Sequence, residues 1–237
     1  MNISQFAARL KTAVTEHQAR TILHDYLTQY GFRSYAFTFY SGHVKSGREL
    51  RYNCVSEALR PWHGHYLEQA YADVDRTLED SHTASLPIFW DVREQLNQAK
   101  HIREQRIRLE SIEFGIDKGL SIPVHGPNHD FVSLTLHQRR NETCLGNYES
   151  MQFEWLSATQ VFYHYIKNIL GLDSLPVAPS RLTRREEQCL ALTAKSWRVY
   201  KIAAELKISP RTVNFHLQNA NKKLGANNKY QACNKYF

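Results

Sequence analysis

The stretch Pro210-Arg-Thr-Val-Asn-Phe-His-Leu-Gln-Asn-Ala-Asn-Lys-Lys-Leu224 carries the clearest pattern in this 237-residue chain. At about 100° per residue, its apolar and polar positions separate onto opposite sides of a helix. The apolar side, which predicts contact with a core, consists of Val213, Leu217, Ala220 and Leu224. The other side carries Arg, Asn, Gln and Lys, the side chains that hydrogen-bond base edges and phosphates in a DNA major groove. The candidate DNA-contacting residues are Arg211, Thr212, Asn214, Phe215, Gln218, Lys222 and Lys223.

The residues before this stretch predict a helix-turn-helix. Apolar spacing around Ile202 indicates a preceding helix, and the turn 207–209 ends at Ser209, a residue type that caps helix N-termini. Pro210 suits the first turn of the next helix. Further upstream, Thr183 and Glu186 have the spacing of a capping box, so residues 182–237 read as an all-α domain.

The positive charge of the chain is confined to this C-terminal region. Residues 181–237 contain 12 Lys and Arg against three Glu, a balance of +9, whereas residues 1–180 have a balance of −2. A folded basic segment of this kind favours a polyanionic partner, most often nucleic acid. An incidental basic surface is the alternative that charge alone leaves open.

A compositional break separates the two regions. The stretch 171–180 contains a glycine, two prolines and two serines, and it follows an aromatic-rich helical segment. Glycine ends helices and proline favours extended linkers. We therefore expect a small-molecule-binding domain over 1–170, a linker over 171–180 and a DNA-binding domain over 181–237.

The N-terminal region alternates between helical and strand patterns. Apolar spacing of three and four predicts helices, and alternating or aromatic-rich runs predict strands. Helices are expected at 3–29 (one or two), 58–71, 92–113 and 148–170, and strands at 32–40, 49–55, 120–124 and 131–136. This order favours an α+β domain with an antiparallel sheet covered by helices, leaving room for a ligand cavity.

Several classes of function are disfavoured. The chain has no P-loop, GxSxG, HExxH or dinucleotide fingerprint, so we expect no enzyme. The four cysteines are widely spaced, and His63 and His65, two residues apart, would diverge on a helix, so we expect no metal and no cofactor. There is no apolar run of about 18 residues and no signal-peptide pattern, which predicts a cytoplasmic protein without membrane contact.

An aromatic and acidic cluster marks the N-terminal region. Trp62 and Tyr66 are one helical turn apart, and Asp75 and Trp90 follow. Buried Trp and Tyr need hydrogen-bond partners, and a carboxylate in the same pocket supplies an acceptor. This pattern is compatible with a ligand site and with an ordinary packed core.

The C-terminal residues resemble the LuxR-type DNA-binding domain. The resemblance is carried by 182–190, by the stretch Ile202-Ala-Ala-Glu-Leu-Lys-Ile-Ser209-Pro-Arg-Thr-Val-Asn-Phe-His216 and by Lys222-Lys-Leu-Gly-Ala226 followed by Asn228-Lys. It implies a helix-turn-helix that binds double-stranded DNA as a homodimer at a two-fold symmetric site. RNA polymerase is a further candidate partner of such a regulator.

The N-terminal cluster resembles the autoinducer-binding domain of the same family. Trp62, Tyr66, Asp75, Trp90 and Gly119 have the signature spacings. The resemblance implies an α/β/α sandwich around a central antiparallel sheet, with an N-acyl-homoserine lactone as ligand. It also implies that Trp62 donates to the lactone carbonyl, that Asp75 accepts from the amide N–H, and that Tyr66, Trp90 and Thr135 line or bond the head group. A buried Asp75 is then expected to be unpaired in the empty pocket, a cost that ligand binding relieves.

Three residues depart from the family pattern. Ala58 stands where a tyrosine usually contacts the ligand, Arg76 stands where proline is usual, and Ser196 replaces the glycine that ends the first helix of the DNA-binding domain. Serine in a left-handed cap costs about 1 kcal/mol relative to glycine.

The departures keep a rival interpretation open. Ala58 and Arg76 favour a regulator of the same architecture that senses another molecule or acts without a ligand. A phosphorylation-controlled response regulator is disfavoured because the N-terminal acidic residues do not form an acidic pocket at strand ends. An enzyme fused to a DNA-binding module is disfavoured by the missing catalytic motifs.

Overall fold

The computed structural model describes residues 1–41, 49–144, 148–172, 182–224 and 226–236. The described residues form two compact units, one running from the first helix to helix α7 and the other from α8 to α11. The stop expected at Gly171 is present, since Gly171 has a φ of 63° after the last turn of α7. The remainder of the expected linker, 173–180, lies outside the described residues.

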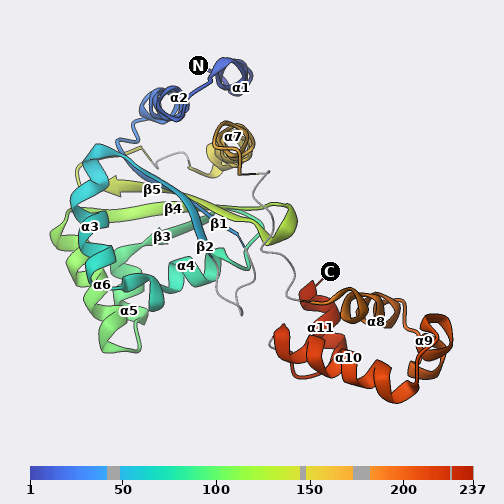
Figure 1. Cartoon of the computed structure of the whole chain (residues 1–237). Helices are drawn as coiled ribbons and strands as arrows, with labels where there is room; N and C mark the ends of the chain where they lie inside the picture. The colour runs from blue at the N-terminus through green and yellow to red at the C-terminus, as the bar shows by residue number, and fades with distance from the viewer. Residues whose placement is uncertain (42–48, 145–147, 173–181, 225, 237) are drawn as a thin grey trace. The chain divides into compact units, whose positions relative to one another are not determined.

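The N-terminal unit is built on one five-stranded sheet (Figure 1). The strand order is β2-β1-β5-β4-β3, and every neighbouring pair is antiparallel. The strands are β1 (Ser34–Ser41), β2 (Glu49–Val55), β3 (Ile88–Asp91), β4 (Ile116–His125) and β5 (Phe131–Arg139). The expected α+β class with a central antiparallel sheet is confirmed.

Helices cover both faces of this sheet, as an α/β/α sandwich requires (Figure 1). One layer contains α1 (Ile3–Thr12), α2 (Glu16–Thr28) and α7 (Tyr148–Ile169). The other contains α3 (Arg60–Glu68), α4 (Arg76–Ser81), α5 (Val92–Gln98) and α6 (Ile102–Glu113). Short 3₁₀ turns lie at Glu57–Leu59, Tyr71–Asp73 and Pro127–His129.

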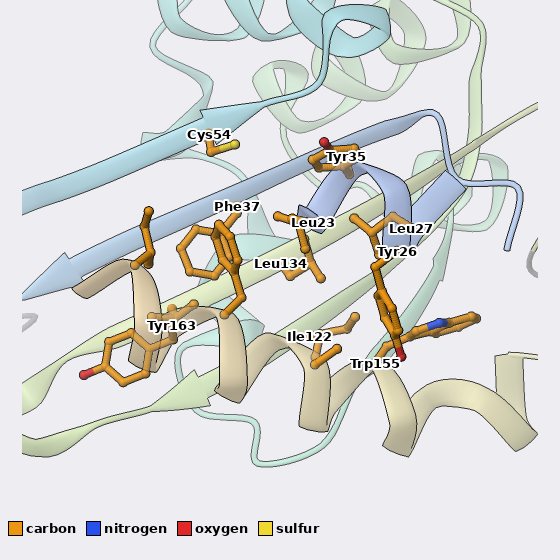
Figure 2. Packing of buried hydrophobic residues seen from close by; sticks show 14 of the residues in the cluster. Leu23, Tyr26, Leu27, Tyr35, Phe37, Cys54, Ile122, Leu134, Trp155 and Tyr163 are labelled. Carbon is orange, nitrogen blue, oxygen red and sulfur yellow. The ribbon is translucent and has the colours of Figure 1, made fainter. Parts of the chain in front are cut away.

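The main hydrophobic core lies between the sheet and the first of these layers. Figure 2 shows residues of this core from several elements: Leu23 and Tyr26 of α2, Trp155 of α7, Phe37 of β1 and Leu134 of β5, with Trp155 beside Tyr26. The ring of Phe37 meets Phe162 of α7 edge-on, with centroids 4.8 Å apart. Burial of this aromatic set fixes which face of each strand points into the core.

The alternation along β5 gives the two faces of the sheet different chemistry. Val132, Leu134 and Leu136 belong to the core, and the residues between them point the other way. Those residues are Ser133, Thr135 and His137. The face that the second helix layer covers is therefore lined by polar side chains.

Two details of the expected secondary structure were wrong, and a third, the number of helices over 3–29, is now fixed. The helix expected over 92–113 is two helices, because Ala99 ends α5 in an extended conformation (φ −65°, ψ 124°). Strand β3 and helix α4 were not expected, since they span only four and six residues. The helical region 3–29 consists of two helices, the second capped by Thr15 through a capping box with Gln18.

The C-terminal unit is all-helical, as expected. Its helices are α8 (Arg184–Ala194), α9 (Val199–Leu206), α10 (Pro210–Lys223) and α11 (Lys229–Tyr236). The capping box of Thr183 and Glu186 and the cap formed by Ser209 are both present. The expected apolar side of α10 is in the core of this unit, where Val213, Leu217 and Ala220 are buried. Among the described residues, no helix is both long enough and apolar enough to span a membrane.

Candidate functional site

A cavity of about 140 Å³ lies on the polar face of the sheet, in the N-terminal unit. Strands β1, β2, β3, β4 and β5 form its floor, and helices α3, α4 and α6 cover it. Its lining mixes apolar and hydrogen-bonding groups: Ala36, Thr38, Tyr40, Leu50, Asn53, Leu59, Trp62, His63, Tyr66, Leu67, Ala72, Asp75, Thr77, Leu78, Ser81, Trp90, Ile107, Arg108, Ser111, Ile116, Ser121, Ser133, Thr135 and His137.

The structure brings together all five residues that the sequence nominated for ligand binding. Trp62 and Tyr66 come from α3, Asp75 from the N-cap of α4, Trp90 from β3 and Thr135 from β5. All five line the same cavity. Residues separated by up to 73 positions in sequence thus share one small volume, and their assignment as ligand contacts stays a prediction.

Asp75 is held by three donors from different elements. Its Oδ1 accepts the backbone N–H of Thr77 at 3.1 Å, which caps α4, and the Nη2 of Arg108 at 2.8 Å. Its Oδ2 accepts the hydroxyl of Tyr66 at 3.1 Å. Burial raises the pKa of Tyr66 well above its ordinary value, and the neighbouring carboxylate raises it further, so the phenol remains a donor.

The expectation of an unpaired Asp75 in the empty pocket was wrong. Arg108 of α6 forms an ion pair with it, and the two side chains are only 9% and 14% exposed. Arg108 also donates to Thr77 Oγ1 at 3.3 Å. The carboxylate is therefore charge-compensated and oriented before any ligand arrives.

Trp90 is positioned by the absence of a side chain on the neighbouring strand. Gly119 of β4 pairs with Trp90, and a Cβ built on Gly119 would lie 1.9 Å from Trp90 Cζ2. The indole N–H of Trp90 donates to Ser121 Oγ at 3.1 Å. Because Ser121 already accepts its N–H, Trp90 offers the cavity a ring surface rather than a hydrogen-bond donor.

The other indole has an N–H to offer. Trp62 packs against Tyr71 and Phe114, with ring centroids 6.2 and 5.4 Å away, and is 8% exposed. No described residue accepts a hydrogen bond from the Trp62 indole. Of the two cavity tryptophans, Trp62 is thus the one that can donate to a ligand carbonyl.

A second polar group lines the cavity beside the nominated residues. Asn53 Nδ2 and His63 Nε2 are 2.8 Å apart. Burial lowers the pKa of His63, and burial also lowers the pKa of His137 to about 4. Both imidazoles are therefore neutral near pH 7, each with one nitrogen that donates and one that accepts.

Two of the departures from the family pattern do not line the cavity. Ala58 is outside the lining, although its neighbour Leu59 is part of it. Arg76 is exposed at the first position of α4, where proline is also well accommodated. The substitution at 76 therefore leaves the cavity wall unchanged.

The two histidines have different partners, and the cysteines form no disulfide. His63 contacts Asn53, whereas His65 contacts Glu110 Oε2 at 2.5 Å, so the two rings have different partners. Among the described residues no group of three or more His, Cys, Asp or Glu side chains has the arrangement of a metal site. All four cysteines are free thiols.

The nominated DNA-contacting residues form one face of α10. Arg211, Asn214, Phe215, Gln218 and Lys222 are exposed, and Phe215 retains 57% of its accessible surface. Thr212 is half-buried at the first turn, where its hydroxyl lies 2.8 Å from Ser209 Oγ. An exposed phenylalanine between polar side chains can contact a thymine methyl group.

Lys223 has a structural partner within the same unit. Its Nζ lies 2.7 Å from Glu186 Oε2, a carboxylate that is only 4% exposed. Burial raises the pKa of Glu186, but Lys223 and the N-cap Thr183 lower it more, so the net shift is downward. This ion pair ties α10 to the N-terminus of α8, and a DNA contact by Lys223 stays a prediction.

Ser196 adopts the left-handed conformation that the sequence suggested. Its φ is 62°, its N–H donates to Thr193 O at 2.9 Å, and Trp197 N–H donates to Leu192 O at 3.1 Å. These are the two hydrogen bonds of a Schellman cap. Lys207, in the turn between α9 and α10, is also left-handed, with a φ of 53°.

Sequence reasoning missed Asn53, His63, Arg108, Ser121 and His137 as cavity residues. The alternation of polar and apolar residues in 131–137 was a readable signal for His137. Arg108 gave no such signal, because nothing in the sequence distinguishes it from the exposed Arg103 and Arg106 of the same helix.

Comparison with protein families assigns both units. Residues 180–235 match the family described as "Bacterial regulatory proteins, luxR family". Residues 15–162 match the family described as "Autoinducer binding domain". The two matches together cover most of the chain.

Similar proteins are named as transcriptional activators. The chain is 33% identical over 174 residues to the transcriptional activator protein VanR of Vibrio anguillarum, covering 73% of this chain and 70% of VanR. It is 26% identical over 179 residues to the transcriptional activator protein LuxR of Aliivibrio fischeri, covering 74% and 69%.

Solved structures show the same fold. The crystal structure of Escherichia coli SdiA aligns with a TM-score of 0.68 at 17% identity, covering 98% of this chain and 94% of SdiA. The transcription factor CepR2 of Burkholderia cenocepacia aligns with a TM-score of 0.56 at 14% identity, covering 71% and 96%.

Proposed function

Because this chain belongs to the LuxR family of autoinducer-binding transcriptional regulators, we propose that its signal is an N-acyl-homoserine lactone held in the cavity between the sheet and α3, α4 and α6. The observation that carries the proposal is the convergence of Trp62, Tyr66, Asp75, Trp90 and Thr135 on that cavity. Trp62 donates to the lactone carbonyl, and Asp75 Oδ2 accepts from the amide N–H. Tyr66, Trp90 and Thr135 enclose the head group.

The size of the cavity favours a short acyl chain. A cavity of about 140 Å³ compares with the ~150 Å³ cavity that takes up a single benzene ring. Even butanoyl-homoserine lactone has more non-hydrogen atoms than benzene, so among acyl-homoserine lactones the shortest chains fit this volume best. The apolar side chains Leu50, Leu67 and Leu78 provide the surface for that chain.

We further propose that residues 1–170 bind the signal and residues 181–237 bind DNA, with 171–180 as the linker. As a homodimer, the protein presents two copies of α10 to a two-fold symmetric promoter site, with RNA polymerase as a further partner. The net charge of +9 over 181–237 supports binding to duplex DNA.

The experiment for the ligand is isothermal titration of the full chain, purified without lactone, with butanoyl-homoserine lactone. Trp62→Phe should weaken binding by about 1–2 kcal/mol, because the ring remains while the N–H donor is lost. Trp155→Phe, on the opposite face of the sheet, is the matched control and should leave the affinity unchanged. Equal affinities for all three proteins would contradict the proposed role of Trp62.

The experiment for DNA is selection of sites from a random duplex library by the full-length protein. We expect the recovered sequences to be two-fold symmetric, and sedimentation to show two protein chains per site. Recovery of sites without symmetry, bound by one chain, would contradict the homodimer.

The ion pair of Asp75 with Arg108 favours a second candidate, a regulator of the same architecture that senses a non-lactone signal or acts without one. Because Arg108 already neutralises Asp75, no ligand is needed to pair this carboxylate. Folded, DNA-binding protein from cells that make no lactone, with an affinity for DNA that lactone does not change, would support this candidate.

A further inference from the structure

We propose that the signal carries a hydroxyl on its acyl chain close to the amide, and that Asn53, His63 and His137 form the subsite that recognises it. This inference rests on the proposed function, because it places the amide of the lactone at Asp75. None of these three side chains was among the residues nominated for the head group.

The first observation concerns Asn53 of β2. Its Nδ2 is engaged with His63 Nε2 at 2.8 Å, but its buried Oδ1 has no hydrogen-bond partner among the residues that the structure describes. Asn53 and His63 both line the cavity, one from the floor and one from the covering helix α3. A buried amide oxygen left without a donor is unfavourable, so a ligand that supplies one gains affinity.

The second observation concerns His137 of β5, which also lines the cavity floor. The residue is 7% exposed, and its Nδ1 also lacks a hydrogen-bond partner within the described part of the chain. Its ring meets Trp90 edge-on with centroids 5.5 Å apart, which fixes the plane of the imidazole. Because the ring is neutral, one of its nitrogens donates and the other accepts. Nδ1 can therefore take either role toward a ligand, depending on the tautomer.

The position of His137 places the subsite near the amide end of the ligand. His137 lines the same cavity as Asp75, Asn53 and His63, and the negative charge of Asp75 acts on its ring. The subsite therefore shares one small volume with the acceptor for the amide N–H. Position 3 of the acyl chain is two bonds from the amide carbonyl carbon. In the proposed binding mode, a substituent at that position reaches this region.

The chemistry of the subsite selects a hydroxyl over the other common substituents. A hydroxyl both donates and accepts, so it pairs with Asn53 and with a neutral imidazole whichever way the amide and the tautomer are set. A ketone only accepts, and an unsubstituted methylene does neither. A site built for a hydroxyl discriminates against analogues that lack it, because its own polar atoms then stay unpaired.

The test uses the full-length protein and three lactones of one chain length: 3-hydroxybutanoyl-, 3-oxobutanoyl- and butanoyl-homoserine lactone. Isothermal titration should show the hydroxyl compound binding about tenfold more tightly than the unsubstituted one, as one or two added hydrogen bonds between neutral groups would give. The ketone should fall between them.

Variants of the subsite provide the control. Asn53→Leu and His137→Phe should each reduce the advantage of the hydroxyl compound severalfold, while His137→Gln, which keeps hydrogen-bonding atoms, should retain part of it. Ser157→Ala is the matched control, because Ser157 lies outside the cavity lining and its hydroxyl donates to Phe153 O of its own helix at 3.0 Å. Its advantage for the hydroxyl compound should equal that of the parent.

The outcomes separate this inference from the proposed function. Equal or tighter binding of butanoyl-homoserine lactone would overturn the subsite while leaving the lactone site intact. An advantage that survives in both Asn53→Leu and His137→Phe would also overturn it. If none of the three lactones binds, the proposed function fails, and the inference fails with it.

Discussion

The guanidinium of Arg108 lies 2.8 Å from the carboxylate of Asp75, and this ion pair joins α6 to the N-terminus of α4 beside the ligand cavity. Among the described residues, Tyr66 is the donor to Asp75 Oδ2, the oxygen proposed above as the acceptor for the ligand amide. In that proposal Arg108 acts through Asp75, as a positioning residue.

Removing Arg108 should be strongly destabilising. Arg108→Met leaves a largely buried carboxylate without its cation, which should lower the free energy of unfolding by about 3–5 kcal/mol in chemical denaturation followed by fluorescence. The double variant with Asp75→Asn should recover most of that loss. Arg106→Met is the control on the same helix, with a 57% exposed side chain, and it should cost less than about 1 kcal/mol. Equal losses for the two single variants would contradict a special role of Arg108.

Gly119 should tolerate no side chain. Gly119→Ala forces the Trp90 ring off its position, so the free energy of unfolding should fall by about 1–3 kcal/mol, and lactone affinity should fall with it. Gly64 of α3 is the contrast, since nothing lies within 4 Å of a Cβ at that position. Gly64→Ala should stabilise the protein by up to about 1 kcal/mol. Thermal denaturation of both variants checks the pair, and a neutral Gly119→Ala would disprove the steric argument.

Ser196→Gly should stabilise the DNA-binding unit. A residue with a φ of 62° is strained unless it is glycine, and the gain should be about 1 kcal/mol. Ser209 in the same unit has a φ of −71° and caps α10, so Ser209→Ala should instead lose about 1 kcal/mol. The melting temperatures should move in opposite directions, and the DNA sequence preference of Ser196→Gly should match the parent. A lower melting temperature for Ser196→Gly would exclude this cap.

Replacing either of the adjacent lysines Lys222 and Lys223 of α10 should have different effects on stability and on the salt dependence of DNA binding. Lys222→Ala should reduce the dependence of log affinity on log salt by about one unit, without loss of stability, if Lys222 contacts a phosphate. Lys223→Ala leaves the buried Glu186 unpaired and should lower the melting temperature of the unit. Arg211→Ala and Gln218→Ala should each weaken a preferred site by about 1–3 kcal/mol and random DNA much less. Identical behaviour of the two lysine variants would contradict this division.

Acid should destabilise the N-terminal unit through His137. Its pKa is about 4 in the folded chain against an ordinary value of 6.5, so between these pH values the unfolded chain binds a proton that the folded chain excludes. Stability should therefore fall as pH drops from 6.5 to 4, by up to about 3 kcal/mol at 1.36 kcal/mol per pH unit. His137→Gln should flatten this slope, and His63, whose pKa burial also lowers, contributes in the same direction. An unchanged slope in His137→Gln would show that the ring is not buried as a neutral group.

Much of this architecture is predictable from sequence because its signals are local. The stripe of Val213, Leu217 and Ala220 defines α10 without any tertiary information, and the capping box at Thr183 fixes the start of α8. Strand β3, with four residues between Ile88 and Asp91, has too few positions for a period to show. The break at Ala99 depends on tertiary packing, which residue periodicity does not report.

The cavity was predictable only in part, for a related reason. Trp62, Asp75 and Trp90 follow a spacing that can be recognised, whereas Arg108 becomes a cavity residue only when α6 packs over the sheet. The charge state of the site depends on that packing. Spacing alone therefore led to an Asp75 without a partner, and the fold supplies one.

The alternation along β5 also makes the hydrophobic core and the cavity depend on the same strand register. A slip of one residue in the pairing of β5 with β1 and β4 would turn Ser133, Thr135 and His137 into the aromatic core and Leu134 into the cavity. Such a sheet would lose its core and its cavity in a single step. If the cavity holds the signal as proposed above, only the native register can bind it.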